Sequence, residues 1–149
     1  KQPVACATGF FMANDDMPVE VAAGLVFHDE RLLITQRLPG EHQGDLWEFP
    51  GGKREASETF EDCLRRELAE ELSITVSVDK MLTEIEHAYP ERTVHLKFFR
   101  CSLVSGEPEA IGCQAFAWVR ADELAAYEFP SADSQLLARL KSGEWWESA

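Results

Sequence analysis

Polar and apolar residues alternate in the first third of the chain in the way that half-buried strands require. Residues 19–27 form one such run and residues 31–37 a second, and the turn-forming segment 28–30 between them predicts a hairpin. A loop that contains proline and two glycines follows over residues 38–45. A short run at residues 47–49 then predicts a third strand, which leads into a tight Pro-Gly-Gly turn.

The spacing of apolar residues changes to the helical period at residue 59. Thr59, followed three residues later by Asp62, is an N-terminal capping pair, and no glycine or proline interrupts residues 59–72. We therefore predict a helix over this segment. Its apolar face, which must pack against the rest of the domain, is formed by Phe60, Cys63, Leu64 and Leu68.

Strand patterns dominate the chain from residue 74 to residue 119. Two short helices are predicted after them, the first capped by Asp122 and the last by Ser131 or Asp133. This order of elements predicts one α/β domain with a central mixed sheet flanked by helices. The predicted strands cover residues 74–78, 81–87, 92–103 and 115–119.

Three carboxylates of the predicted helix stand out by their position. Glu67 and Glu71 project from its apolar face, and Glu70 lies beside them. Carboxylates that face a protein interior are costly unless a cation meets them, and oxygen donors at this spacing suit Mg²⁺ or Mn²⁺. The alternative, a solvated acidic face, is disfavoured by the inward position of Glu67 and Glu71. Arg66, four residues before Glu70, can steady the cluster through an ion pair.

Composition narrows the class of protein. The chain has 149 residues, of which 45% are hydrophobic, and this suits a single globular domain. A formal net charge of −13 disfavours a nucleic-acid polymer as partner, because such binding depends on Lys and Arg neutralising phosphates. No apolar run approaches the roughly 20 residues of a membrane span. Residues 1–17 lack the apolar core of a signal peptide, and we interpret them as an N-terminal extension.

The cysteines indicate a reducing compartment. Cys6, Cys63, Cys101 and Cys113 show no C-x-x-C spacing, which disfavours a zinc site, and their arrangement gives little support to a disulfide framework. Reduced thiols in a cytoplasm are the expectation.

The helix and the turn before it resemble the Nudix box, whose pattern is G-x5-E-x7-R-E-U-x-E-E-x-G-U, with U an aliphatic residue. Ser73 departs from the pattern, since the family has glycine at this position. The segments 46–53 and 127–133 are similar to the MutT branch, which includes oxidised-nucleotide sanitising enzymes and CTP pyrophosphohydrolases. The residues that match the box in register are Gly52, Glu58, Arg66, Glu67, Leu68, Glu70, Glu71 and Ile74.

The resemblance implies a fold and a reaction. The fold is the Nudix α/β/α sandwich with a central mixed sheet, which would occupy residues 18–149 as a single domain. The reaction is Mg²⁺-dependent hydrolysis of a nucleoside triphosphate to a monophosphate and pyrophosphate, with Mn²⁺ as a possible substitute for Mg²⁺. The implied role is nucleotide-pool sanitation, and the implied partner is a small nucleotide rather than a nucleic acid or a membrane. Monomer and homodimer both remain open.

The resemblance also assigns the catalytic end of the site. The Gly51 carbonyl would join Glu67, Glu70 and Glu71 as a metal ligand, and Glu58 would orient or support this cluster. Glu67 is the first choice for the general base, although members of the superfamily use different glutamates. Arg66 belongs to the same catalytic set.

The substrate end is assigned in the same way. Arg37, Lys53 and Arg92 match positions that contact the phosphates or sugar, and Phe49 and Asp133 would line the base pocket. Asp133 could instead be only a helix cap. An ionised aspartate accepts hydrogen bonds, which favours the cytosine amino group. The N7–H of 8-oxoguanine could also donate to it, so (d)CTP and 8-oxo-dGTP types both stay open.

Two departures leave alternatives open. MutT-like proteins carry a further loop glutamate where Gly112 stands, and Glu107 and Glu109 are the nearest substitutes. Ser73 allows a second hypothesis, a catalytically weak domain that binds a nucleotide as a sensor. Hydrolysis of other nucleoside diphosphate derivatives is a third.

Overall fold

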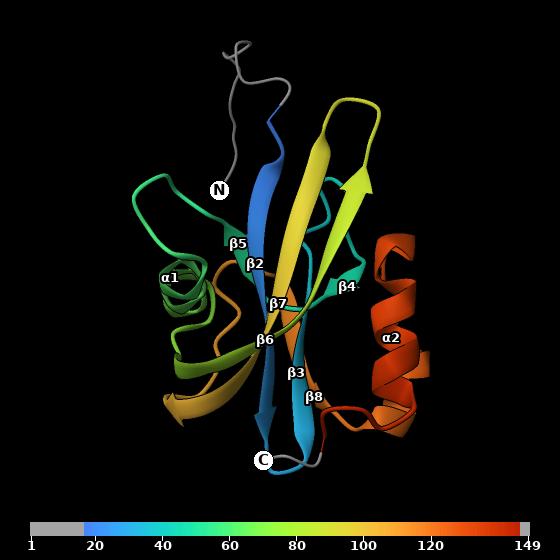
Figure 1. The fold of residues 1–149 in the computed structure, drawn as a ribbon. Coiled ribbons are helices and arrows are strands. Elements are labelled where there is room, and N and C mark those ends of the chain that lie inside the picture. Colours follow the sequence, from blue (N-terminus) through green and yellow to red (C-terminus); the bar gives the residue numbers. More distant parts are fainter. Residues whose placement is uncertain (1–16, 147–149) are drawn as a thin grey trace.

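The computed structural model describes residues 17–146, which form a mixed seven-stranded sheet between helices (Figure 1). The path of the sheet is β4-β3-β2-β7-β6, with β5 paired to β2 and β8 paired to β3. β2 and β7 run parallel and the other pairs are antiparallel. The strands are β2 (Val19–His28), β3 (Arg31–Gln36), β4 (Trp47–Glu48), β5 (Gly51–Lys53), β6 (Thr75–Ala88), β7 (Thr93–Ser105) and β8 (Ala115–Val119).

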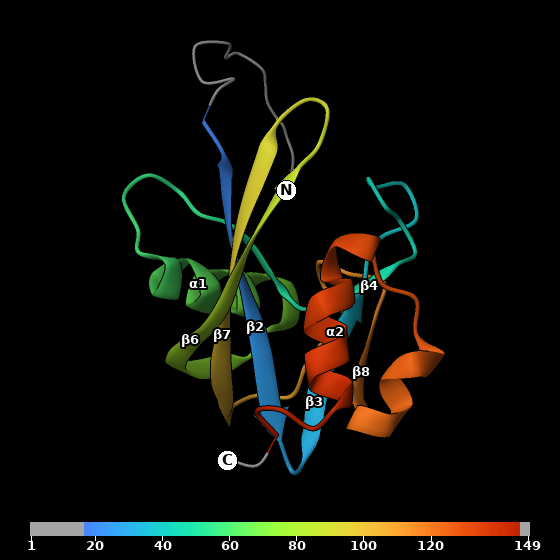
Figure 2. The ribbon, with the colours of Figure 1, turned by 45° about the vertical axis from the view of Figure 1, so that its right-hand side comes forward.

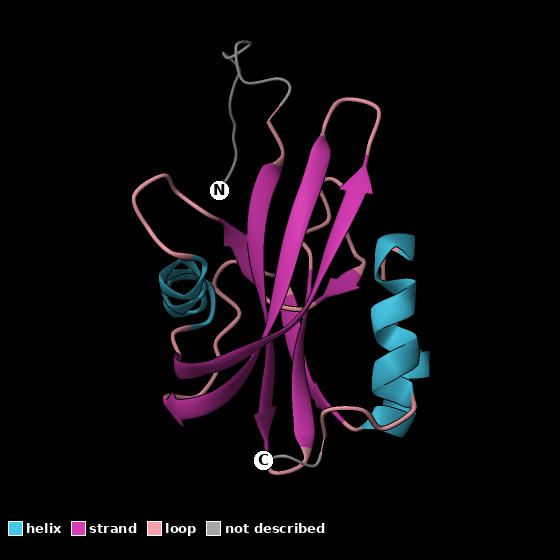
Figure 3. Ribbon diagram, in the orientation of Figure 1, coloured by secondary structure: helices cyan, strands magenta, loops and turns pink. Residues whose placement is uncertain are grey.

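Two α-helices lie on opposite sides of this sheet, which confirms the predicted layers (Figure 3). α1 (Phe60–Leu72) packs on one face through Cys63, Leu64 and Leu68. α2 (Ser134–Lys141) packs on the other, with the 3₁₀ segments η2 (Ala121–Ala126) and η3 (Ser131–Asp133) before it. β2 is covered on both faces, so its residues 22–27 are buried without alternation.

The start of α1 confirms the predicted capping pair, because the Thr59 hydroxyl accepts a hydrogen bond from the Asp62 backbone N–H at 3.0 Å. The two later helices form as predicted, but the predicted side-chain caps were wrong. Arg120, not Asp122, precedes η2, and its N–H donates to the Glu123 carboxylate at 2.8 Å. Asp133 stands at the N-cap of α2 without a capping hydrogen bond from its side chain.

The Pro-Gly-Gly segment is a strand rather than only a turn. β5 pairs with β2, with Gly51 opposite Ala23 and Gly52 opposite Ala22. A Cβ atom on Gly51 would lie 1.9 Å from the Ala22 carbonyl oxygen, so only glycine allows this approach. The pairing fixes the chain that leads into α1 against the centre of the sheet.

The two strands predicted at 74–78 and 81–87 form one continuous strand, β6, with irregular register near residues 79 and 82. β6 and β7 make a long hairpin whose tip, residues 89–92, projects beyond the rest of the sheet (Figure 2). In the described part of the chain, no helix is both long and apolar enough to cross a membrane. Cys63, Cys101 and Cys113 are free and buried, and Cys6 lies outside the described residues, as do residues 1–16 of the predicted extension.

The end of α1 supports a prediction about stability. Ser73 follows the helix with φ 61° and ψ 35°, in the left-handed region that favours glycine. A serine there costs about 1 kcal/mol relative to glycine, so Ser73→Gly should stabilise the protein by roughly that amount. Urea unfolding monitored by fluorescence measures the change. A lower unfolding midpoint in the variant would contradict the assigned backbone conformation.

Candidate functional site

One cavity of about 1040 Å³ lies between α1, β5, the β6–β7 hairpin tip and η3. This volume is at the upper end of the range for small-molecule sites. The cavity brings together site residues that were predicted from distant parts of the sequence. Those on its wall are Arg37, Phe49, Gly51, Lys53, Arg66, Glu67, Glu70, Glu71, Arg92 and Asp133, whereas Glu58 does not line it.

The side of the cavity formed by α1 carries Glu67, Glu70 and Glu71, which we call the acidic wall. Glu67 is buried, with 7% of its surface exposed, because α1 turns this residue toward the sheet. A Cβ atom on Gly52 would lie 2.2 Å from the Glu67 carboxylate carbon. Glycine at position 52 therefore makes room for the Glu67 carboxylate directly beside the β5 backbone.

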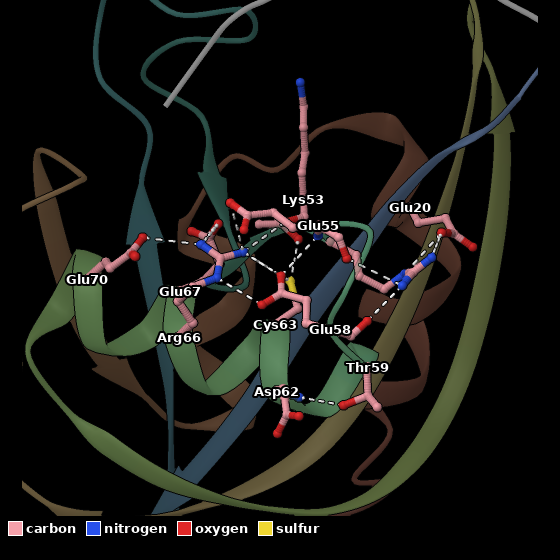
Figure 4. A network of polar contacts seen from close by, with 12 residues as sticks. Glu20, Lys53, Glu55, Glu58, Thr59, Asp62, Cys63, Arg66, Glu67 and Glu70 are labelled. Carbon is pink, nitrogen blue, oxygen red and sulfur yellow. Dashed lines mark hydrogen bonds and ion pairs between the residues drawn. The ribbon is translucent and has the colours of Figure 1, made fainter. Parts of the chain in front are cut away.

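Arg66 connects this wall to Glu58 (Figure 4). Its guanidinium donates to both Glu58 oxygens at 2.6 and 3.0 Å, to Glu67 at 3.1 Å and to Glu70 at 3.3 Å. This hydrogen bonding lowers the pKa of Glu58 to about 2 and raises the pKa of Arg66. Glu58 thus connects to the acidic wall through Arg66.

The acidic wall fits a hard divalent cation by its chemistry. Its donors are all oxygens, and the Gly51 backbone lines the cavity beside them. Among residues 17–146, no three carboxylate, imidazole or thiol groups converge closely enough to form a metal site by themselves. Instead the Arg66 guanidinium contacts both Glu67 and Glu70 and places a positive charge beside them.

The opposite end of the cavity holds a second pair of acidic side chains, Glu48 and Asp133. Asp133 is 8% exposed, and burial, followed by the nearby charge of Glu48, raises its pKa to about 6. Burial also raises the pKa of Glu48, against the opposing effect of Arg37. Phe49 stacks on Phe129 at a centroid distance of 5.1 Å and gives this end an apolar surface.

Sequence reasoning missed Glu48, although it lies in the Trp-Glu-Phe-Pro-Gly-Gly segment that carried the family resemblance. It also did not foresee how Arg37 is used. The Arg37 guanidinium contacts Glu48 at 2.9 Å, the His42 carbonyl at 2.8 Å and Glu41 at 3.4 Å. In this structure Arg37 therefore orders the loop 38–46 and orients Glu48.

Lys53 and Arg92 are the cavity cations whose side chains make no hydrogen bond or ion pair within the described residues, and both residues are exposed. Arg92 lies at the hairpin tip with Tyr89, another residue that the sequence did not indicate. The Tyr89 ring meets His42 edge-on at 5.9 Å, so the tip and the loop 38–46 contact each other at the cavity. Lys53 and Arg92 can therefore bind an anionic ligand in the cavity.

Gly112 packs against the end of α1. A Cβ atom on Gly112 would lie 2.8 Å from Cγ of Glu71, and its N–H donates to the Glu71 carbonyl at 3.0 Å. The predicted substitutes do not compensate for the missing glutamate. Glu107 lines a different hollow beside Trp118, and Glu109 does not line the cavity.

Comparison with known proteins identifies the family and agrees with the fold. The family model described as the NUDIX domain matches residues 22–139. The 8-oxo-dGTP diphosphatase of Haemophilus influenzae is 35% identical over 85% of this chain and 93% of its own. The CTP pyrophosphohydrolase of Escherichia coli is 34% identical over 80% of this chain and 88% of its own. The solution structure of the E. coli ORF135 protein matches with a TM-score of 0.74 and 29% identity, over 93% of this chain and 98% of that one.

The Arg66–Glu58 pair predicts a pH dependence of stability. The pKa of Glu58 falls from its ordinary value of 4.5 to about 2 on folding. Its contribution to stability is thus fully present above pH 4.5 and is lost as the pH falls toward 2. We expect Glu58→Gln to destabilise the protein near neutral pH and to approach the wild type in stability as the solution is acidified.

Urea unfolding of both proteins at a series of pH values measures this difference directly. Because the two proteins differ only at residue 58, the difference reports the titration of Glu58 together with the Arg66 contacts that it supports. A wild-type advantage that stays constant from neutral pH to pH 3 would contradict the assignment.

Proposed function

The chain belongs to the NUDIX family, and we propose that it hydrolyses nucleoside triphosphates of the (d)CTP or 8-oxo-dGTP type to a monophosphate and pyrophosphate. The observation that carries this proposal is a single cavity with two chemically different ends. One end is the acidic wall, and the other holds Glu48, Phe49 and Asp133. Two unpaired cations, Lys53 and Arg92, also line it. This arrangement suits a ligand with an anionic chain and a polar aromatic ring.

In this proposal the acidic wall and the Gly51 carbonyl hold Mg²⁺, which Mn²⁺ could replace. When bound, the ion neutralises phosphate oxygens and lowers the pKa of a coordinated water. Glu67 is the first choice to accept the proton of the water that attacks phosphorus. Arg66 orients Glu67 through a hydrogen bond, while Lys53 and Arg92 bind the phosphate chain.

Asp133 is the proposed reader of the base. With a pKa of about 6, its carboxyl is mainly ionised at neutral pH and then only accepts hydrogen bonds. An acceptor suits the N4 amino group of cytosine and repels the O6 oxygen of guanine. Because the side chain makes no capping hydrogen bond to α2, its oxygens stay available to a ligand.

A catalytically silent nucleotide sensor receives less support. The sequence basis for it was Ser73, but this residue adopts the left-handed conformation that the family glycine would supply. The acidic wall is also complete, and a domain that only binds ligands has no need to keep costly inward carboxylates. We further propose a role in sanitising the nucleotide pool of a cytoplasm, as a monomer or homodimer.

The direct test is pyrophosphate release from dCTP, CTP, 5-methyl-dCTP, 8-oxo-dGTP and dGTP in the presence of Mg²⁺. We expect kcat/KM to be highest for one of the cytosine or oxidised guanine substrates and lowest for dGTP. Activity should disappear when EDTA is added. Absence of pyrophosphate release from every nucleotide would overturn the proposal.

The acidic wall generates a prediction about turnover. Glu70→Gln and Glu71→Gln each remove a charged ligand, so kcat should fall on the order of 100-fold or more while the protein stays folded. Glu61→Gln is the matched control, since Glu61 is exposed on the first turn of the same helix. Steady-state kinetics at saturating Mg²⁺ give the comparison. Near wild-type kcat in both variants would remove these residues from the metal site.

Asp133 generates a prediction about specificity. Asp133→Asn adds a donor that can meet guanine O6, so relative kcat/KM should move toward guanine-type substrates by about 1–3 kcal/mol. In the wild type, protonation below about pH 6 adds the same donor ability. Discrimination by the wild type should therefore narrow as the pH falls through 6, whereas Asp133→Asn should show no such change. An unaltered substrate ratio in the variant would assign base recognition elsewhere.

A further inference from the structure

Arg54 follows β5 directly, and the functions described so far do not use it. Its guanidinium forms an ion pair with the Glu20 carboxylate on β2, with Nε at 3.0 Å. The Nη1 atom donates to the Glu58 backbone carbonyl at 2.7 Å. Arg54 therefore connects β2 to the segment 54–59, which we call the supporting loop.

The environment of Arg54 restricts its movement. Its guanidinium lies over the Phe60 ring at 5.3 Å, and Lys97 lies 4.2 Å from the same ring centroid. The side chains of Arg54 and Glu20 are each about one-third exposed or less. A doubly bonded, partly buried pair of this kind holds its geometry better than an isolated surface ion pair.

The supporting loop is linked to the acidic wall by a series of hydrogen bonds through Glu58 and Arg66. The Glu55 backbone N–H donates to a Glu58 oxygen at 2.9 Å, so the loop fixes the Glu58 carboxylate from its own side. Glu58 holds the Arg66 guanidinium through two hydrogen bonds. Arg66 then contacts Glu67 at 3.1 Å. Each link is a charged or backbone hydrogen bond with a defined direction.

We propose that Arg54, anchored by Glu20, is a positioning residue for the acidic wall. It fixes the supporting loop, and the loop sets the position of the guanidinium that orients Glu67. This inference rests on the proposed metal-dependent function. Arg54 is poorly placed to bind an anionic ligand directly, because its Nε, Nη1 and Nη2 atoms all have protein partners.

The test measures metal binding without substrate. Mn²⁺ is titrated into the full chain, and the free ion is followed by electron paramagnetic resonance. Residues bonded directly to a metal ligand change affinity by about 10–100-fold, and Arg54 acts one or more bonds further away. We therefore expect Arg54→Met to raise the Mn²⁺ Kd by about 3–10-fold, a smaller effect than that range.

Arg65→Met is the matched control. Arg65 likewise forms an ion pair, at 2.7 Å to Asp62, but this pair is more exposed and lies outside the supporting loop. Its Mn²⁺ affinity should equal that of the wild type. Arg54→Lys keeps the positive charge but lacks the planar guanidinium that donates to several partners at once. Its Mn²⁺ affinity should therefore fall between those of the wild type and Arg54→Met.

Glu20→Gln provides a second variant that changes few atoms and keeps the fold. It should weaken Mn²⁺ binding in the same direction, and combining it with Arg54→Met should add little, because both changes break one connection. Additive effects of the two substitutions would show that the residues act separately, and would overturn the anchoring of Arg54 by Glu20.

Unchanged Mn²⁺ affinity in Arg54→Met would also overturn the proposal. If KM for the nucleotide then rose alone, Arg54 would be a substrate contact instead. Failure of the proposed function gives a different result, since the wild type would release no pyrophosphate while Arg54→Met still bound Mn²⁺ more weakly.

Discussion

The ion pair between Arg66 and Glu58 decides what the acidic helix can do, because α1 cannot turn the Glu67 carboxylate outward. Cys63, Leu64 and Leu68 pack one face of α1 against the sheet. Glu67 lies on the same face, so its carboxylate points inward. Inward like charges on adjacent turns repel each other and lose water. Arg66 offsets this cost, and Glu58 keeps Arg66 in place through two hydrogen bonds. The acidic wall is thereby positioned where a cation and a phosphate chain would meet it.

The two ends of the cavity use the same functional group in opposite environments. Glu58, behind the catalytic end, accepts strong hydrogen bonds and has its pKa lowered to about 2. Asp133, at the other end, is buried near Glu48 and has its pKa raised to about 6. A carboxylate with a lowered pKa can hold Arg66 in place, whereas a carboxyl that titrates close to neutrality can recognise a polar ring and respond to pH. This division supports assigning chemistry to one end and recognition to the other.

Glycines allow the backbone to lie close to neighbouring segments around the cavity, and this keeps the charged groups of the site together. Gly51 allows β5 to pair with the middle of β2, Gly52 leaves room for the Glu67 carboxylate, and Gly112 packs on the aliphatic part of Glu71. Each of these positions would bring a side chain within 3 Å of its neighbour. Small residues therefore set the width of the site between the sheet and α1 as directly as the charged residues set its chemistry.

Local signals in the sequence determined the class of the fold, the bounds and cap of α1, and the residues of the acidic wall. These features depend on neighbours within one or two turns, so Thr59 with Asp62 and the spacing of Glu67, Glu70 and Glu71 were sufficient to predict them.

Only the tertiary structure decided the pairing of β5 with β2, the joining of two predicted strands into β6, and the use of Arg37 on its own loop. It also decided that Asp133 faces the cavity beside Glu48 instead of capping α2. These features depend on contacts between segments far apart along the chain. The stability of each of these contacts depends on burial and on partners from other segments, which the local sequence does not contain.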